Sequence, residues 1–191
     1  MQVFVDKNGK YGFTDETGKI VISAVFDFAL PFSEGFSVVC INGKMGIGQT
    51  FFINETGQVA INSNFCGARS FSEGLAQVEK IVDGQRKTGF INHQGELVIP
   101  LKYNFAMSFH NGFAPVCVGE SWASGKYGCI DKTGKEVIPI QYNYLEPYDN
   151  GQYIVKDGSG WFLIDVYETL LSPSFQTQTL LLDFIQTRGT M

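Results

Sequence analysis

Charged residues are scarce in this chain of 191 residues, since 17% are Asp, Glu, Lys or Arg against roughly 25% in an average globular protein. The 14 basic residues are scattered rather than clustered, and the formal net charge is −5. Such a chain has no general attraction to phosphate backbones, so we expect no nucleic acid among its partners. The 44% of apolar residues is enough for a core and excludes general disorder.

Long apolar runs are also missing. No run reaches the roughly 18 residues that a membrane helix needs. The first residues, Met1 to Asp6, meet an acid too early for the apolar region of a signal peptide. We therefore expect no membrane insertion and a cytoplasmic location.

Cysteine pairs with metal-binding or redox spacing are absent, because none of the four cysteines forms a C-x-x-C motif. Each has apolar neighbours, which favours reduced, buried thiols over disulfides, reactive thiols or metal ligands. These residues are Cys40, Cys66, Cys117 and Cys129.

Aromatic residues and glycine, in contrast, are abundant, with 17 Phe, 8 Tyr, 2 Trp and 22 Gly. They recur in register, with a spacing of 38 or 39 residues. Two columns are glycines: Gly18, Gly57, Gly95 and Gly134, then Gly35, Gly74, Gly112 and Gly151. Two more are aromatic: Phe26, Phe65, Tyr103 and Tyr142, then Phe32, Phe71, Phe109 and Tyr148. We expect both aromatic columns to be buried between repeats, since so small a unit cannot cover its own rings.

The first glycine column predicts hairpin turns. Asp or Asn stands three residues before each glycine, as in Asp15-Glu-Thr-Gly18, and its side chain can bond the following backbone N–H groups. The glycine accepts the left-handed backbone that such a turn requires. Strand-like segments flank each turn, and no helical period is found before residue 160.

The predicted fold is therefore all-β, with tandem antiparallel β-hairpin repeats of about 39 residues in an open solenoid-like array. A closed ring resembling a β-propeller is the alternative. We interpret residues 1–191 as a single repeat domain. Its repeats are 10–43, 44–84, 85–125 and 126–158, followed by a degenerate fifth repeat and cap at 159–191. The pattern does not decide whether the apolar segment 180–185 of this cap is a helix or a strand.

Several segments together resemble the bacterial WG-repeat family. They are 125–142, which begins Gly-Lys-Tyr-Gly-Cys-Ile-Asp, and the segments 71–78 and 109–116 with their Phe-x-x-Gly pattern. The tryptophan that gives the family its name is replaced by Tyr11, Thr88 or Tyr127, and Phe51 takes the place of the strand glycine in the second repeat. The resemblance implies a β-rich repeat protein and transfers no catalytic residue.

The side chains that could take part in catalysis or ligand binding are better explained by structural roles in turns. His93 and His110 occupy unrelated columns, which predicts two exposed turn histidines rather than a joint site. Glu34 and Glu73 share a column that becomes asparagine in the next two repeats, so paired-carboxylate catalysis is not expected. The glycines of 43–48 lack the spacing of a phosphate loop. We expect no enzyme activity, cofactor or metal site.

The loops 42–50, 79–88 and 119–125 do not follow the repeat pattern, so we expect them to determine which partner is bound. They carry the mixture of charge and aromatic side chains that is typical of protein interfaces: Lys44, Arg86, Lys87, Glu120 and Trp122. We therefore expect a non-catalytic protein-interaction or scaffold module. Binding of a glycan or small ligand on surface aromatics is the alternative, and it requires Tyr11, Tyr127 and Trp161 to be exposed in a row.

Overall fold

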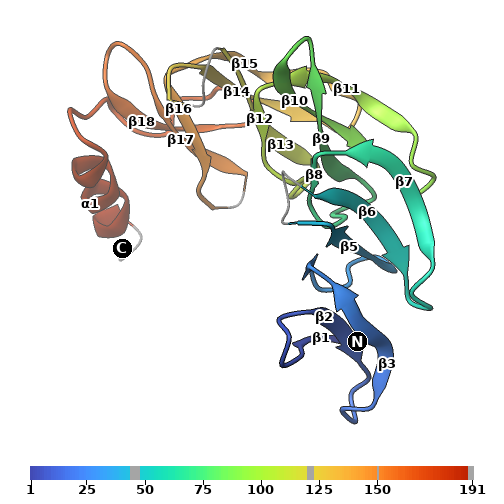
Figure 1. The fold of residues 1–191 in the computed structure, drawn as a ribbon. Coiled ribbons are helices and arrows are strands. Elements are labelled where there is room, and N and C mark those ends of the chain that lie inside the picture. The colour runs from blue at the N-terminus through green and yellow to red at the C-terminus, as the bar shows by residue number, and fades with distance from the viewer. Residues whose placement is uncertain (44–47, 120–122, 150, 189–191) are drawn as a thin grey trace. The chain divides into compact units, whose positions relative to one another are not determined.

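The computed structural model describes residues 1–43, 48–119, 123–149 and 151–188, with the backbone alone at 63 and 64 (Figure 1). The chain divides into two compact units, Met1–Lys102 and Tyr103–Met191. The described residues form small antiparallel sheets and one short helix, and none of the sheets closes into a barrel. The prediction of an all-β repeat fold is confirmed.

Strands β1 to β11 form three sheets. The first sheet contains β1 (Gln2–Val5), β2 (Tyr11–Thr14) and β3 (Ile20–Phe26). The second contains β4 (Phe28–Ala29), β5 (Phe36–Ile41), β6 (Gln49–Asn54) and β7 (Val59–Phe65). The third contains β8 (Gly67–Ala68), β9 (Ala76–Val82), β10 (Gln85–Ile91) and β11 (Leu97–Tyr103).

Two further sheets and the helix belong to the second unit. The fourth sheet contains β12 (Phe105–Ala106), β13 (Phe113–Val118), β14 (Lys126–Asp131) and β15 (Glu136–Tyr142). The fifth contains β16 (Tyr144–Pro147), β17 (Gln152–Lys156) and β18 (Trp161–Asp165), and α1 (Gln178–Arg188) follows it.

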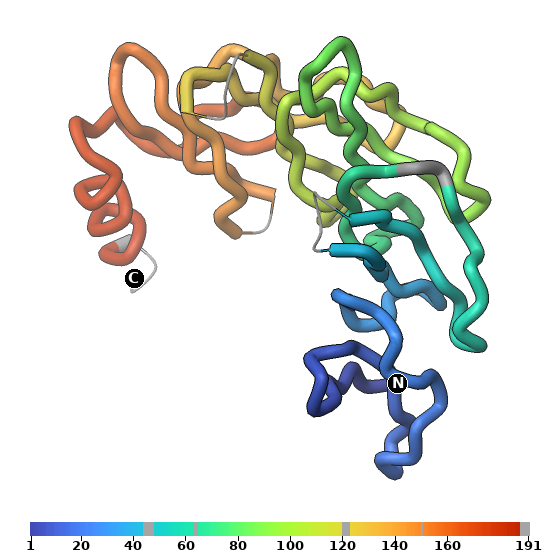
Figure 2. Tube along the Cα trace, viewed as in Figure 1, coloured from blue at the N-terminus to red at the C-terminus, as the bar shows by residue number. Residues whose placement is uncertain are grey.

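Each sequence repeat contributes to two sheets. The repeat 10–43 supplies β2 and β3 to the first sheet and β4 and β5 to the second. A single residue, Asp27, joins β3 to β4, and the same one-residue junction recurs between later sheets, as Figure 2 traces. The Asp27 carboxylate accepts hydrogen bonds from Lys10 Nζ and, at 3.2 Å, from Gly43 N. A polar side chain thus holds the chain where it changes sheet.

The hairpin turns form as predicted. At the first turn, Asp15 Oδ1 accepts hydrogen bonds from Thr17 N and Lys19 N at 2.9 and 3.0 Å. The four turn glycines are left-handed, with φ between 79 and 84°. At Gly95 this glycine also permits close packing, because a Cβ would lie 2.9 Å from Ile61 Cγ2 of the preceding sheet.

The strand glycines have a different cause. Gly12 and Gly128 lie where the first strand of each hairpin faces a β-bulge, and a Cβ on Gly128 would lie 2.5 Å from the carbonyl oxygen of Ile138. Phe51 replaces this glycine in the second sheet, and its buried side chain joins the cluster around Phe13 and Ile53.

Apolar clusters lie between successive sheets within each unit. In the first unit, one cluster joins the first and second sheets around Phe13 and Ile53, and another joins the second and third around Phe52 and Ile91. In the second unit, a cluster around Cys129 and Ile164 joins the fourth and fifth sheets. The predicted burial of the first aromatic column is confirmed, since each ring is at most 6% exposed: Phe26, Phe65, Tyr103 and Tyr142.

The C-terminal segment covers the last sheet. Phe175 pairs with Trp161, and Leu170 pairs with Ile164, so residues 170–175 take the place of the missing fourth strand. Helix α1 then places the fully buried Leu181 against Ile154 and Leu163. The cap is therefore helical. The described part of the chain contains no helix with the length and hydrophobicity to cross a membrane.

Two matched glycines test the packing of the turns. Gly18 and Gly95 share φ near +80°, but only Gly95 faces a close side chain. We expect Gly18→Ala to lower the free energy of unfolding by about 1 kcal/mol through backbone strain. Gly95→Ala should cost about 1–3 kcal/mol more through overpacking against Ile61. Chemical denaturation measures both values. The extra cost should disappear in an Ile61→Ala background, and equal losses at the two glycines would contradict this packing.

A turn carboxylate should make stability depend on pH. The Thr133 hydroxyl, 2.6 Å from Asp131 Oδ1, and the backbone N–H groups of Lys135 and Thr133 hold the pKa of Asp131 below its usual value. Because the unfolded carboxyl protonates first, near pH 4, this stabilisation is present above about pH 4 and is lost as the pH falls through the lowered pKa.

The test compares unfolding between pH 6 and 2 for wild type and Asp131→Asn. Asn54 already makes the equivalent turn bonds with an amide oxygen, so the variant should keep its turn and lose less stability in acid. Asp183→Asn, on the exposed side of α1, is the matched control. Identical pH slopes for all three proteins would exclude this role of Asp131.

Candidate functional site

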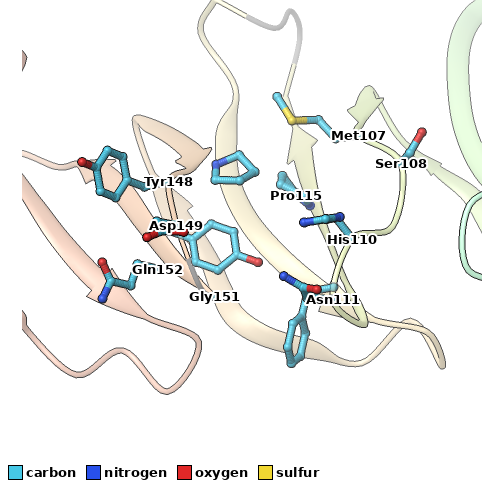
Figure 3. A pocket seen from close by; sticks show the side chains of 12 residues that line it. Met107, Ser108, His110, Asn111, Pro115, Tyr148, Asp149, Gly151 and Gln152 are labelled. Atoms are coloured by element: carbon cyan, nitrogen blue, oxygen red, sulfur yellow. The ribbon is translucent and has the colours of Figure 1, made fainter.

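A pocket of about 230 Å³ lies in the second unit, between the turn that precedes β13 and the turn that precedes β17 (Figure 3). The first turn contributes Met107, Ser108, His110 and Asn111, and β13 contributes Phe113 and Pro115. Pro147, Tyr148, Asp149 and Gly151 line the opposite side with Gln152 and Tyr153 of β17.

The corresponding turns of the first unit are bonded directly to each other. Ser33 Oγ donates to the carbonyl oxygen of Phe71 at 2.7 Å, and Gly74 N donates to a carboxylate oxygen of Glu34 at 3.1 Å. Glu34 also bonds His93 Nε2 at 2.8 Å. These contacts offset the strained left-handed backbone of Glu34, whose φ is 53°.

His93 is therefore not the exposed turn residue that the sequence predicted. Its ring stacks on Phe36, with centroids 5.4 Å apart, and contacts Phe71 at 4.5 Å. It fixes the hairpin turn of the third sheet against the turns of earlier repeats. Side chains from three repeats thus meet around His93, namely Glu34, Phe71 and His93 itself, and the role of the Glu34–His93 pair is in packing.

At the pocket, two substitutions change this arrangement. His110 takes the column position of Ser33, and Asn111 takes that of Glu34, with the same left-handed backbone (φ 52°). Both His110 and Asn111 are exposed. The side chains that bond neighbouring turns in the first unit are thus replaced by side chains that face the pocket (Figure 3).

Tyr148 departs from its column. Phe71 and Phe109 are 2% and 1% exposed, as predicted, and Phe32 is half-buried, but Tyr148 is 42% exposed. The prediction that all four rings of the second aromatic column are buried was wrong at this position.

The reason is an exchange of large and small residues on facing sheets. Between the second and third sheets, Phe52 and the small Ala76 belong to one buried cluster, and the ring centroids of Phe52 and Phe71 are 5.1 Å apart. Between the fourth and fifth sheets the equivalent residues are Cys129 and Tyr153, whose Sγ and hydroxyl oxygen are 3.5 Å apart. The Tyr153 ring fills the room of the missing phenylalanine, and Tyr148 is left at the surface.

Burial limits the chemistry of Tyr153, which lines the pocket, and of its neighbour Cys129, which does not. It raises the pKa of the Cys129 thiol to about 11. Burial also raises the pKa of Tyr153, with a further contribution from Cys129. Both groups are therefore protonated near neutral pH and offer no anionic nucleophile or base. The exposed charge-bearing groups of the lining are the Asp149 carboxylate and the His110 imidazole.

The five interface residues expected from the sequence are placed in part. Lys44, Glu120 and Trp122 lie outside the described residues. Arg86 lies in β10 and donates to Glu79 Oε2 at 2.7 Å. Lys87 follows in the same strand, in the column of Lys10 and Lys126, which donate to the junction residues Asp27 and Asn143.

The aromatic row that glycan binding requires is partly covered. Tyr11, Tyr127 and Trp161 are half-buried. Tyr11 packs against Phe28, with ring centroids 5.8 Å apart, and Tyr127 and Trp161 both pack against Tyr144. The contacts of Tyr11 and Tyr127 are tilted and that of Trp161 is T-shaped, and each of the three rings is partly covered. Within the described residues, no cluster of three or more His, Cys, Asp or Glu is placed to hold a metal ion.

The fold is that of a β-repeat protein built from small antiparallel sheets that are joined by turns. The sequence model of the family described as WG containing repeat matches residues 11–44, 51–80, 89–122 and 127–161. The chain belongs to this WG-repeat family. A search of curated proteins gives no match.

The exchange at Tyr148 predicts a difference in stability between equivalent residues. Phe71→Ala removes a buried ring and should lower the free energy of unfolding by about 3–5 kcal/mol. Tyr148→Ala should cost less than about 1 kcal/mol, because the ring already faces solvent. Thermal and chemical unfolding measure both, and Phe109→Ala serves as the buried control in the second unit. A loss above about 2 kcal/mol for Tyr148→Ala would place that ring in the core.

Proposed function

We propose that this protein is a non-catalytic interaction module that binds a protein partner at the pocket whose lining comes from residues 107–115 on one side and from residues 147–149 and 151–153 on the other. The observation that carries the proposal is the exposure of Tyr148, which lines the pocket, whereas its column equivalents Phe71 and Phe109 are buried and Phe32 is half-buried. Tyrosine combines a large apolar surface with a polar hydroxyl and is enriched at protein interfaces. An exposed tyrosine beside a recess is therefore a suitable anchor for a partner.

The size of the pocket favours a partner side chain over a free ligand. Its volume of about 230 Å³ is below the roughly 300–1,000 Å³ of pockets that enclose drug-sized ligands. Apolar walls from Pro115 and Pro147 and polar groups from Asn111 and Gln152 suit one side chain and the backbone beside it. The pocket thus resembles a recess that receives a residue of a peptide segment.

The pocket chemistry supports a non-catalytic role. Ser108, His110 and Asp149 all line it, but the Ser108 hydroxyl points away from His110 (Figure 3). A nucleophile and its base must lie within hydrogen-bond reach of each other. The buried Cys129 and Tyr153 are protonated near neutral pH and provide no substitute.

The residues expected at an interface from the sequence remain candidate contacts for a partner: Lys44, Arg86, Lys87, Glu120 and Trp122. Among them, Arg86 is half-exposed in β10, where it forms an ion pair with Glu79. We place the protein in the cytoplasm, since its four cysteines are free thiols, as is usual in a reducing compartment.

Site-specific photo-crosslinking in cells tests the proposal. A benzophenone amino acid at Tyr148 should give covalent adducts with a partner protein, because Tyr148 lines the pocket and is exposed. The matched control carries the same group at Tyr167, which is 85% exposed in the same unit and does not line the pocket.

Adducts at position 148 but not 167 support the proposal. No adducts at position 148, or the same set at both positions, would contradict it. The non-catalytic part fails if the purified protein turns over a compound in a substrate screen and a variant of His110 or Asp149 abolishes that turnover.

A further inference from the structure

We infer that the pocket receives a cationic side chain, arginine in particular, from the partner. This inference rests on the proposed function. The pocket lining contains an exposed carboxylate, Asp149, the amides of Asn111 and Gln152, and the Tyr148 ring, but no Lys or Arg. The site thus offers carboxylate and amide oxygens as hydrogen-bond acceptors, together with an aromatic ring.

The charge distribution along the chain agrees with a cationic ligand. Residues 103–191 contain nine Asp or Glu and five Lys or Arg, a net charge of −4. Residues 1–102 contain ten and nine, a net charge of −1. Most of the negative charge therefore belongs to the unit that contains the pocket, where it raises the local concentration of cations.

A guanidinium group fits these side chains better than an ammonium group. Its planar fork donates to a carboxylate and an amide oxygen together, and its flat face stacks on an aromatic ring. Figure 3 shows Tyr148, Asp149 and Gln152 on one side of the pocket and His110 and Asn111 on the other. The apolar stem of arginine would contact Met107 and Pro115, as long cationic side chains do on apolar surface.

Other occupants match the pocket less well. A phosphate or carboxylate ligand would meet Asp149 and would find His110 as the one lining group able to carry positive charge. A neutral aromatic side chain would contact the prolines but would make no use of the negative charge of Asp149. The arginine proposal uses both the polar and the apolar walls.

Capped tripeptides provide the probe. Acetyl-Gly-Arg-Gly-amide is compared with its citrulline counterpart, which has nearly the same shape and carries no charge. Nuclear magnetic resonance titrations of the full chain at pH 8, where imidazoles are neutral, follow the side-chain amides of Asn111 and Gln152. We expect the arginine peptide to shift both amides and to bind at least about 3-fold more tightly than the citrulline peptide.

Charge variants give the second measurement. Asp149→Asn should weaken binding of the arginine peptide about 2- to 5-fold, as expected for a solvent-exposed ion pair. Asp183→Asn makes the same change of charge on an exposed helix position of the same unit and should leave binding unchanged. Both substitutions are at exposed residues, so unchanged melting temperatures confirm folded variants.

The outcomes separate this inference from the proposed function. Equal binding of the two peptides, absence of shifts with the arginine peptide, or equal weakening by both Asp variants would each overturn the cationic ligand. Adducts at position 148 that persist in any of these cases would leave the protein-binding proposal standing. Absence of adducts together with arginine-selective binding would contradict the protein partner and retain the cationic ligand class.

Discussion

The stability of this protein depends on the contact between the faces of successive small sheets. A sheet of three or four short strands cannot exclude water from its own apolar face, so it needs a cover from the next sheet. Within each unit, this contact pairs a large residue with a small one across the gap, as Phe52 does with Ala76. The turn glycines extend the same contact, because Gly95 lets the hairpin end approach Ile61.

Within each unit, each pair of successive sheets combines one large and one small residue at this position, but the sheet that supplies the large residue changes. Cys129 and Tyr153 fill the gap between the fourth and fifth sheets with the size order reversed. Cores tolerate such exchanges when total volume is kept. The surface beside this exchange differs from that of the other repeats, since Tyr148 is exposed there and lines the pocket. A packing difference inside the repeat array is thus accompanied by a surface side chain, Tyr148, that is buried or half-buried at the equivalent positions of the other repeats.

Much of the fold could be predicted from the sequence because its causes are local. A left-handed glycine after an Asx turn, as at Asp15 and Gly18, is determined by four neighbouring residues. The burial of the first aromatic column followed from the period alone. The helical cap could not be predicted, because the apolar segment 180–185 lies outside the repeat and has no column to compare with.

The pocket could not be predicted from single columns, because its cause lies in two columns that face each other. Phenylalanine at 13, 52 and 90 gives way to Cys129, and small residues at 37, 76 and 114 give way to Tyr153. Each change is visible in the sequence. Their meaning requires knowing which strand faces which, information that the repeat period does not contain. For the same reason, the contact of His93 with Glu34 could not be predicted, since the two residues are 59 positions apart in the sequence.

The distribution of each sequence repeat over two sheets has a consequence for chain integrity. A cut in the loop after β5 would separate β4 and β5 from β6 and β7, although all four belong to one sheet. The two fragments would still share the six residue pairs between β5 and β6 and the apolar cluster around them. We therefore expect a chain cut between β5 and β6 to remain associated through these contacts.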